Sequence, residues 1–333
     1  MAEKPIVVGY GELMYDEMYD ERGNIIAQGG GGCTWNILYN LAMFKGERIY
    51  AVGNCGNDEK GRLAVQELRD RGINADSIRV DDKPTNTICA TVPDVIDGDN
   101  DIRFSLQSPI TGQTSYEVSE DLCVEMPPEL EDVDKLIIVD RLRRYNLDFI
   151  KRTKNKKTAL DLGKGLQKPL EELDADFILD FLRHVDILQL NGNVVSIILN
   201  KLGISTLQEL YQLLNLDLLV VTNGTKCAKF LFEQDDSVEE LHMLPEKAEQ
   251  VANSMGAGNA FFAIVLKGYS EYLSQNKRID PAFIDTVFKR GNRLAGIVVS
   301  QMETRYKGSL TNAQLSGEMN GQGLGEEDGE VFL

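Results

Sequence analysis

Short apolar runs that recur along the chain, with stretches of helical spacing between them, limit the fold more than any other feature of the sequence. The runs read PIVVGY, ERIYAVG, KLIIVD, KTALDL, VDILQL and DLLVVT. Continuous aliphatic runs of this kind are typical of strands buried on both faces of a sheet. Because strands that alternate with helices are joined by right-handed crossovers, the pattern predicts an α/β fold. We expect three layers, α/β/α, with a mostly parallel sheet.

Two of the intervening helices are expected to be amphipathic. Their buried faces would be formed by Trp35, Leu38, Leu41 and Ala42 in the first helix and by Leu63, Val65 and Leu68 in the second. Asp58 stands where it can cap the start of the second helix, and Gly72 stands where it can end that helix. We therefore assign both residues structural roles, and we assign Asp58 no catalysis.

Two segments interrupt the alternation of strands and helices. Each has a turn signal between β-type flanks, Arg22-Gly23-Asn24 in one and Asp97-Gly98 in the other, which is the pattern of a β-hairpin. The hairpins, at about 12–28 and 85–112, can form a small sheet that stands off the main domain as a β lid over a ligand. Two ordinary surface hairpins would carry the same pattern, and the sequence alone leaves both interpretations open.

The cysteines and the N-terminus bear on the compartment. The five cysteines are odd in number and scattered, without a C-x-x-C pair, as expected of reduced thiols. The start, MAEKPIVVGYGE, does not resemble a signal peptide, and no apolar stretch is long enough to span a membrane. We therefore expect a cytoplasmic protein.

The charge of the chain argues against several partners and mechanisms. Its 333 residues carry a formal net charge of −18, which repels nucleic acid and anionic membranes. The two histidines, His184 and His242, are too few and too far apart for a histidine-rich zinc site or a Ser-His-Asp mechanism. Beyond residue 306 the chain becomes rich in Gly, Asn and Glu. We expect one domain over 1–306 and an acidic, disordered tail over 307–333.

Four consecutive glycines run into the first predicted helix in the stretch AQGGGGCTWNILYNLA. Glycine lets the backbone approach a ligand closely, and the helix that follows offers free N–H groups at its start. Gly31, Gly32 and Asn36 are therefore candidate ligand contacts. A flexible linker is the alternative, but a linker does not need Trp35 and a core-facing stripe directly after it.

Two further glycine turns follow in the second half of the chain. Thr222 ends a buried strand and Gly224 lies in the next turn, where open parallel sheets bind nucleotides. A routine hairpin turn fits that stretch equally well. Gly256, Ala257 and Gly258 precede a long apolar helix, whose free N–H groups and dipole favour an anion.

The order of these elements resembles the ribokinase/PfkB family of carbohydrate and nucleoside kinases, from about Val7 to Met302. The family's Gly-Glu-x-x-x-Asp is similar to residues 11–16, its Gly-Gly-x-x-x-Asn to 31–36, its Gly-x-x-Gly-x-Asp-x-x-Gly to 53–61, its Thr-x-Gly to 222–224 and its Asp-Thr-x-Gly-Ala-Gly-Asp-x-Phe to 253–261. The resemblance implies a ribokinase-like fold and favours the lid interpretation of the two hairpins.

The resemblance also implies roles for particular residues. On the substrate side, Asp16 would bind neighbouring hydroxyls of a sugar or nucleoside, with Gly31, Gly32 and Asn36 completing the pocket. On the cofactor side, ATP or another nucleotide would be bound by residues that follow strands or begin a helix: Asn191, Thr222, Gly224, Gly256, Ala257 and Gly258. We also expect that an open lid sheet can pair with a second copy, giving a homodimer.

Three positions depart from the family pattern. Asn259 stands where the family has its catalytic base, an aspartate, and Asn253 replaces the other aspartate of the same signature. The family's Asn-x-x-Glu falls on 191–194, so that Val194 replaces the glutamate. All three lost carboxylates would have served Mg·ATP or proton transfer, and an amide cannot accept the proton. The use of Mg²⁺ therefore stays open.

Three functions remain to be compared. The first is a kinase-like protein that binds a sugar or nucleoside and ATP with weak or no phosphoryl transfer. The second is an active ATP-dependent kinase whose base comes from Asp58, Asp140 or Asp161. The third is a nicotinamide dehydrogenase, which we disfavour because GYGELM lacks the third glycine of G-x-G-x-x-G. The basic stretch at 140–144 is expected to be a solvated edge rather than an anion site.

Overall fold

The structure is a computed structural model that describes residues 4–44, 46–92, 103–105, 124–139, 141–163, 167–246, 248, 251–275, 277–301, 305, 307–308, 310 and 314–315. Its main sheet has the strand order β13-β12-β11-β10-β9-β8-β1-β4-β5. These strands are β1 (Ile6–Glu12), β4 (Arg48–Gly56), β5 (Asn74–Asp81), β8 (Lys135–Val139), β9 (Lys156–Leu162), β10 (Ile187–Asn191), β11 (Leu218–Thr222), β12 (Ala228–Gln234) and β13 (Ser237–Met243). All neighbours pair in parallel except β12, which is antiparallel to β11 and β13. Every apolar run that we predicted as a strand is a strand of this sheet.

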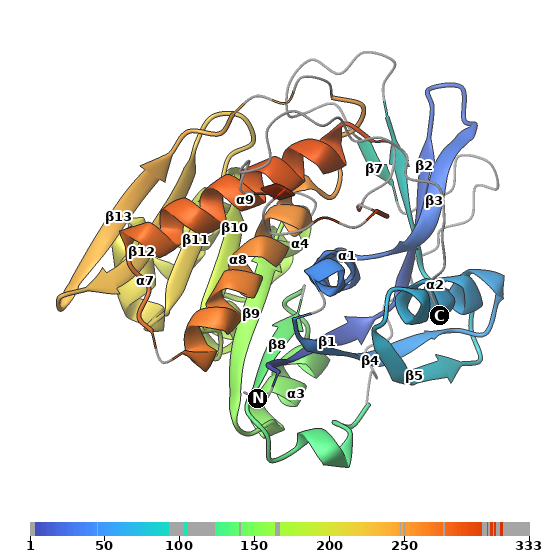
Figure 1. Cartoon of the computed structure of the whole chain (residues 1–333), viewed down its shortest axis with the longest axis horizontal. Coiled ribbons are helices and arrows are strands. Elements are labelled where there is room, and N and C mark those ends of the chain that lie inside the picture. The colour runs from blue at the N-terminus through green and yellow to red at the C-terminus, as the bar shows by residue number, and fades with distance from the viewer. Residues whose placement is uncertain are drawn as a thin grey trace.

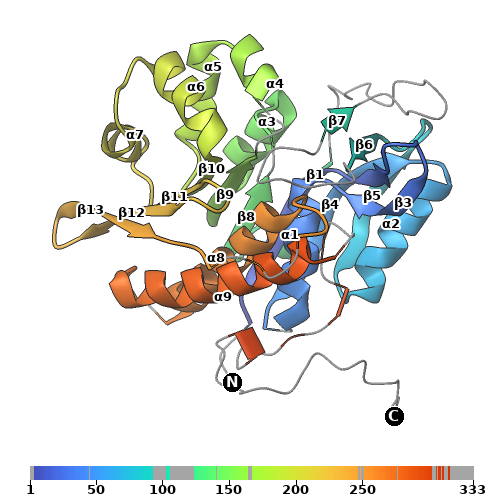
Figure 2. The same cartoon turned by 90° about the horizontal axis from the view of Figure 1, so that it is seen from above.

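Helices cover both faces of the sheet (Figures 1 and 2). They are α1 (Cys33–Leu41), α2 (Glu59–Asp70), α3 (Arg144–Arg152), α4 (Gln167–Glu172), α5 (Ala175–Leu182), α6 (Gly192–Leu202), α7 (Leu207–Leu214), α8 (Ala257–Ser274) and α9 (Pro281–Val299), with short 3₁₀ turns at Ala42–Phe44 and Pro128–Leu130. One face carries α1, α8 and α9, and the other carries α3, α5, α6 and α7 (Figure 2). The predicted three-layer arrangement is confirmed.

The pleat of the central strands divides the core between these two faces. Along β1, Val7 belongs to the cluster beneath α1 and α8, whereas Val8 and Tyr10 belong to the cluster beneath α3 and α5. Successive side chains of a strand point to opposite faces, so a strand covered on both sides must be apolar throughout. This requirement explains the unbroken aliphatic runs in the sequence.

The strand order reverses at β1. The chain passes from β1 to β4 and β5 on one side, and later continues from β8 through β9, β10 and β11 on the other. In open α/β sheets such a switch point leaves a crevice at the carboxyl ends of the strands, where ligands bind. Trp35 is fully buried there and donates its indole N–H to the carbonyl oxygen of Glu12 at 2.8 Å, which holds the start of α1 at the end of β1.

A second, smaller sheet stands off the main one and is consistent with a lid (Figure 1). Its order is β3-β2-β6-β7, with β2 at Met14–Tyr19, β3 at Ile25–Gly31, β6 at Thr87–Thr91 and β7 at Arg103–Ser105. The pairs β2–β3 and β6–β7 are antiparallel, as expected of two hairpins, and β2 joins the hairpins by pairing with β6 in parallel. The predicted turn at Asp97-Gly98 lies outside the described residues.

Two details of the helices differ from the sequence-based expectation. Helix α1 is buried on every side from Thr34 to Leu41, because α8, β1 and β3 surround it, so it is not amphipathic. On α2 the buried face contains Ala64 and Leu68, whereas Leu63 is 44% exposed and does not belong to it. The predicted ends of α2 are confirmed: Asp58 accepts a hydrogen bond from the N–H of Gly61 at 2.9 Å, and Gly72 follows the helix with a φ of 83°.

The C-terminal segment was expected to be a disordered tail from residue 307 onward, and most of it lies outside the described residues. Of the described part, Leu310 and Leu315 are buried in the cluster beneath α1, α8 and α9. Within the described chain, none of the helices combines the length and the apolar character needed to cross a membrane.

Candidate functional site

Asp16 and Asn36 meet where the small sheet joins the main domain. Asp16 lies on β2 and Asn36 on the first turn of α1. Both side chains are buried, and Asn36 Nδ2 donates to Asp16 Oδ2 at 3.4 Å. Gly31 lies so close to the Asp16 carboxylate that an added methyl group would overlap it. Gly32 begins α1 with a φ of 95°, a conformation that favours glycine. The structure thus brings together the four residues that we predicted for the substrate side.

Arg141 also lies at this edge of the main sheet. Its Nη2 is 3.3 Å from Sδ of Met14 on β2, and burial lowers the pKa of its guanidinium from the ordinary value. Arg144 behaves differently, because it is exposed and lies over the ring of Phe177 at 5.6 Å. The expected solvated basic edge therefore holds for Arg144 but not for Arg141, and Asp140 lies outside the described residues.

The start of α8 has the features of an anion site. Gly256 precedes the helix with a φ of 84°, and no side chain caps the free N–H groups that Ala257 and Gly258 contribute to the first turn. The turn before it is closed by Asn253, whose Oδ1 accepts the N–H of Met255 at 2.7 Å. Uncapped N–H groups at a helix N-terminus, together with the helix dipole, attract phosphate.

Asn191 and Thr222 lie side by side at the ends of β10 and β11. Asn191 Oδ1 accepts the N–H of Asn193 at 3.0 Å and so caps α6. After Thr222 the chain turns through Gly224, with a φ of 51°, into the antiparallel strand β12. The hairpin interpretation of this stretch is confirmed, and the hairpin keeps Thr222 and Gly224 at the carboxyl edge of the sheet.

Asn259 is held by a carboxylate on the neighbouring strand. Its Nδ2 donates to Asp161 Oδ2 of β9 at 2.8 Å, and Gln189 Nε2 of β10 donates to Asp161 Oδ1 at 3.1 Å. Gln189 Nε2 also donates to the carbonyl oxygen of Gly258 at 3.2 Å. Burial raises the pKa of Asp161 to about 6, although the two amide donors act in the opposite direction.

This arrangement decides how Asn259 can interact with a ligand. An ionised carboxylate only accepts hydrogen bonds, so the amide nitrogen of Asn259 must be the atom that faces Asp161. The amide oxygen is then directed elsewhere and can accept a hydrogen bond from a hydroxyl group. It cannot remove the proton of that hydroxyl.

Gln189 is a site residue that our sequence analysis missed. It is buried within an otherwise aliphatic strand, and Asp161 occupies a similar place in the next strand of the sheet. A polar residue inside a continuous apolar run signals a buried hydrogen bond, because an unpaired polar group there is costly. The runs VDILQL and KTALDL both carried that signal.

The loop before α8 contacts the small sheet. Met255 and Ala27 pack against a cluster formed by Met18, Ala90 and Val92. Asn253, which is fully buried, places its Nδ2 3.8 Å from Sδ of Met18. The loop that precedes the candidate anion site therefore contacts β2, the strand that carries Asp16.

The position that the family resemblance assigns to a Mg²⁺-organising glutamate holds no carboxylate. Val194 is fully buried in the apolar cluster beneath α6, and the Asn191 oxygen already caps that helix. Among the described residues no group of three or more histidine, cysteine, aspartate or glutamate side chains could hold a metal ion. Mg²⁺ prefers carboxylates and phosphates as ligands, so an ion at this site would arrive with the nucleotide.

Comparison with known proteins identifies the family. The model of the pfkB family of carbohydrate kinases matches residues 6–311. A probable fructokinase-5 from Arabidopsis thaliana is 22% identical over 283 residues, which are 80% of this chain and 83% of the relative.

Two solved structures share the fold. A fructokinase variant from Vibrio cholerae O395, described with fructose, ADP and potassium, is 18% identical with a TM-score of 0.68, covering 95% of this chain and 98% of that one. A nucleoside kinase from Burkholderia thailandensis, described with inosine, is 16% identical with a TM-score of 0.68, covering 94% and 95%. Since the family match extends from β1 to beyond α9, the chain belongs to the pfkB family of carbohydrate kinases.

Proposed function

We propose that this protein binds a sugar or nucleoside beneath the lid and ATP at the start of α8, with weak or no phosphoryl transfer. The observation that carries the proposal is the hydrogen bond from Asn259 to Asp161. It supports a role for Asn259 in positioning a hydroxyl group and not in deprotonating it. Loss of a general base typically lowers a rate by ~10²–10⁴.

The second lost carboxylate supports the same conclusion. Val194 has become part of the apolar core. A side chain in that position no longer organises Mg²⁺ near the phosphates, and phosphoryl transfer depends on neutralising phosphate charge. The backbone N–H groups of the Gly256 turn are unaffected, and such groups bind phosphate without any carboxylate. ATP binding and phosphoryl transfer are therefore expected to be separable in this protein.

The proposal is tested by measuring binding and turnover on the same sample. ATP at about 100 times its Kd should stabilise the protein by ~2.7 kcal/mol, seen as a raised melting temperature. With D-fructose or inosine, ADP production should stay well below the ~1–100 s⁻¹ of ordinary kinases. Turnover within that range refutes the loss of catalysis, and a melting temperature unaffected by ATP refutes the binding.

A single variant locates the nucleotide. Gly258 is exposed, and a Cβ atom added there would have Gln189 Nε2, at 3.9 Å, as its nearest side-chain neighbour. Gly258→Asp should therefore fold. Its carboxylate would lie at the free N–H groups and repel other anions from them. We expect the ATP-induced rise in melting temperature to disappear in this variant, with the D-fructose or inosine response unchanged.

The substrate side is tested through Gly31. Gly31→Ala should displace the Asp16 carboxylate, because the added methyl group overlaps it. Hydrogen bonds to a charged group contribute ~1.5–3 kcal/mol. We therefore expect calorimetry to show sugar or nucleoside binding weakened roughly 10- to 100-fold. Gly296→Ala, in α9 with open space around it, is the matched control and should bind normally. Equal affinity in the two variants would remove Asp16 from the site.

The second candidate function, an active kinase with a different base, is favoured by one observation. Asp161 lies beside the family's catalytic position, and its raised pKa of about 6 suits a general base near neutral pH. Under this alternative, Asp161→Asn lowers kcat by ~10²–10⁴, whereas under our proposal residual turnover is unaffected. Asp58 is a weaker choice, because it caps α2 and accepts two hydrogen bonds from Thr85.

Other features of the molecule stay predictions. The family match favours both kinase readings over the nicotinamide dehydrogenase. A homodimer through the lid would use a free edge of the small sheet, and β3, with Ile25 and Ile26 exposed, is such an edge. We propose the lid at about 12–28 and 85–112 as expected, and a main domain that extends beyond residue 306, because Leu310 and Leu315 are buried in its core.

A further inference from the structure

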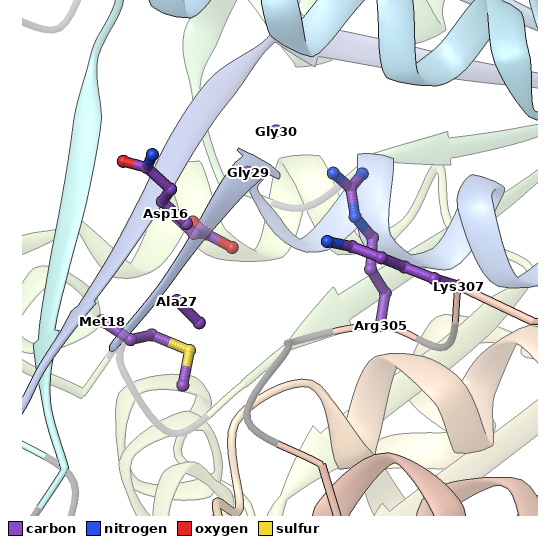
Figure 3. Close-up of a pocket in the computed structure, with 8 residues that line it drawn as sticks. Asp16, Met18, Ala27, Gly29, Gly30, Arg305 and Lys307 are labelled. Atoms are coloured by element: carbon purple, nitrogen blue, oxygen red, sulfur yellow. The ribbon is translucent and has the colours of Figure 1, made fainter. Parts of the chain in front are cut away.

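A small pocket lies between the lid and the C-terminal segment. It is lined by Asp16, Met18 and Ala27 of the lid hairpin, by the Gly29–Gly30 backbone, and by Arg305 and Lys307 (Figure 3). The space is about 10 Å³, which is room for about one water molecule. The pocket includes the carboxylate that the family resemblance assigns to sugar hydroxyls. It therefore extends the substrate site toward two cationic side chains.

Arg305 is built into the wall of this pocket. Its side chain is 3% exposed, its Nη2 pairs with the Glu67 carboxylate, and its guanidinium lies 4.2 Å from the centre of the Tyr39 ring. Glu67 in turn accepts the backbone N–H of Gly30 at 2.9 Å. Arg305 is thereby fixed against the same strand that carries the glycines of the substrate site.

The rest of the C-terminal segment is also anchored. Arg71, which directly follows α2, donates from its Nη1 to the carbonyl oxygen of Lys307 at 3.1 Å. Leu310 and Leu315 are buried in the core beyond it. The two cations are therefore part of the folded domain, and the pocket wall that they form is not a loosely attached tail.

One donor of the Arg305 guanidinium is unused. Arg305 Nη1 is buried and has no hydrogen-bond partner among the described residues. An unpaired buried donor on a charged group is costly, which indicates a missing partner. The exposed Lys307 side chain reaches across the pocket, and its nitrogen points toward the Asp16 carboxylate (Figure 3).

We propose that the substrate site takes a polyhydroxylated ligand that carries an anionic group, a carboxylate or a phosphate. Arg305 and Lys307 bind the anionic group, and Asp16 binds a hydroxyl. Guanidinium groups match the geometry of carboxylate and phosphate oxygens. The bound ligand fills the water-sized space, and the flexible Lys307 side chain turns from Asp16 to the anionic group. The inference rests on the proposed function for the hydroxyl-binding role of Asp16.

The experiment compares ligands that differ in charge. Two matched pairs are D-fructose with D-fructose 6-phosphate, and D-glucitol with D-gluconate. Calorimetry at low salt should give a Kd at least ~10-fold lower for the anionic member of one pair than for its neutral member. The pair that shows this difference identifies the anionic group as a phosphate or a carboxylate. Arg305→Gln and Lys307→Met should each reduce this preference. Lys289→Met removes an exposed charge from α9 and should leave the preference unchanged.

The outcomes separate the alternatives. Lys307→Met keeps the test valid if Arg305→Gln fails to fold, because Lys307 is exposed. Equal Kd values within both pairs, or no binding of any of the four compounds, overturns the inference. Tighter binding of D-fructose by either variant also overturns it, since the segment would then be a plug that blocks a neutral sugar. The ATP-induced stabilisation is measured on the same samples. If it is lost while the anion preference persists, the nucleotide half of the proposed function fails and this inference stands.

Discussion

Asn259→Asp is expected to raise phosphoryl transfer by ~10²–10⁴ over the wild-type protein, because it places a proton acceptor at the position that the family resemblance assigns to the catalytic base. The change is nearly isosteric, so the helix start and its N–H groups should be preserved. Turnover is measured as ADP production with ATP, Mg²⁺ and whichever of D-fructose, inosine or their anionic analogues binds the wild type. ATP binding should be unchanged, which separates a gain in chemistry from a gain in affinity.

The neighbouring carboxylate makes this variant more informative. The new side chain would lie at hydrogen-bond distance from Asp161 Oδ2, where Asn259 Nδ2 now donates at 2.8 Å. Two carboxylates this close retain one proton between them. Because Asp161 is fully enclosed, it keeps the shared proton, and the carboxylate of residue 259 stays ionised as the base.

Matched variants guard this experiment. Asn200→Asp adds the same charge at an exposed position of α6 and should leave turnover at the wild-type level. Asn253→Asp restores the other aspartate of the signature, but Asn253 is fully buried beside Met18, so this change should mainly lower stability. Turnover of Asn259→Asp that stays at the wild-type level, with folding and ATP binding intact, means that the missing base is not what limits the reaction.

Asp161→Asn is expected to flatten the dependence of stability on pH. The pKa of Asp161 is raised in the folded protein, from 3.8 to about 6. A raised pKa means that the favourable contribution is fully present below pH 4 and is lost as the pH rises through about 6. The shift corresponds to about 3 kcal/mol. Between pH 4 and 7 the wild type should therefore lose about that much stability relative to Asp161→Asn.

The measurement is urea unfolding of both proteins at several pH values, with the difference in unfolding free energy plotted against pH. Asp148→Asn, at an exposed position of α3, is the control and should follow the wild type throughout. A difference between Asp161→Asn and wild type that is constant from pH 4 to 7 would show that Asp161 ionises normally, and it would also remove the reason to consider it as a base.

Much of the fold could be predicted because its signals are local. The central strands lie between two helical layers, and burial on both faces requires the aliphatic runs that the sequence displays. Gly32 marks the start of α1, since its φ of 95° is a conformation that favours glycine. The ends of α2 follow from Asp58 and Gly72 in the same local way.

The two expectations about helices that were wrong assumed that each helix has the sheet on one side and solvent on the other. Helix α1 was expected to expose one side, but α8 and the small sheet cover that side as well. Leu63 fits an apolar stripe by spacing and is still 44% exposed, whereas Ala64 and Leu68 are fully buried. A helical repeat indicates which residues share a face, and it does not indicate how many neighbours surround the helix.

The sequence by itself determined the three-layer fold and the family, because both are carried by residue types in a linear order. Only the tertiary structure decided what stands beside Asn259 and Asp16. Asp161 and Gln189 reach Asn259 from two neighbouring strands, and Arg305 reaches the Asp16 pocket from beyond the last helix. Such contacts join residues far apart in the chain. Their distances follow from the packing of whole strands and helices, which no local sequence pattern encodes.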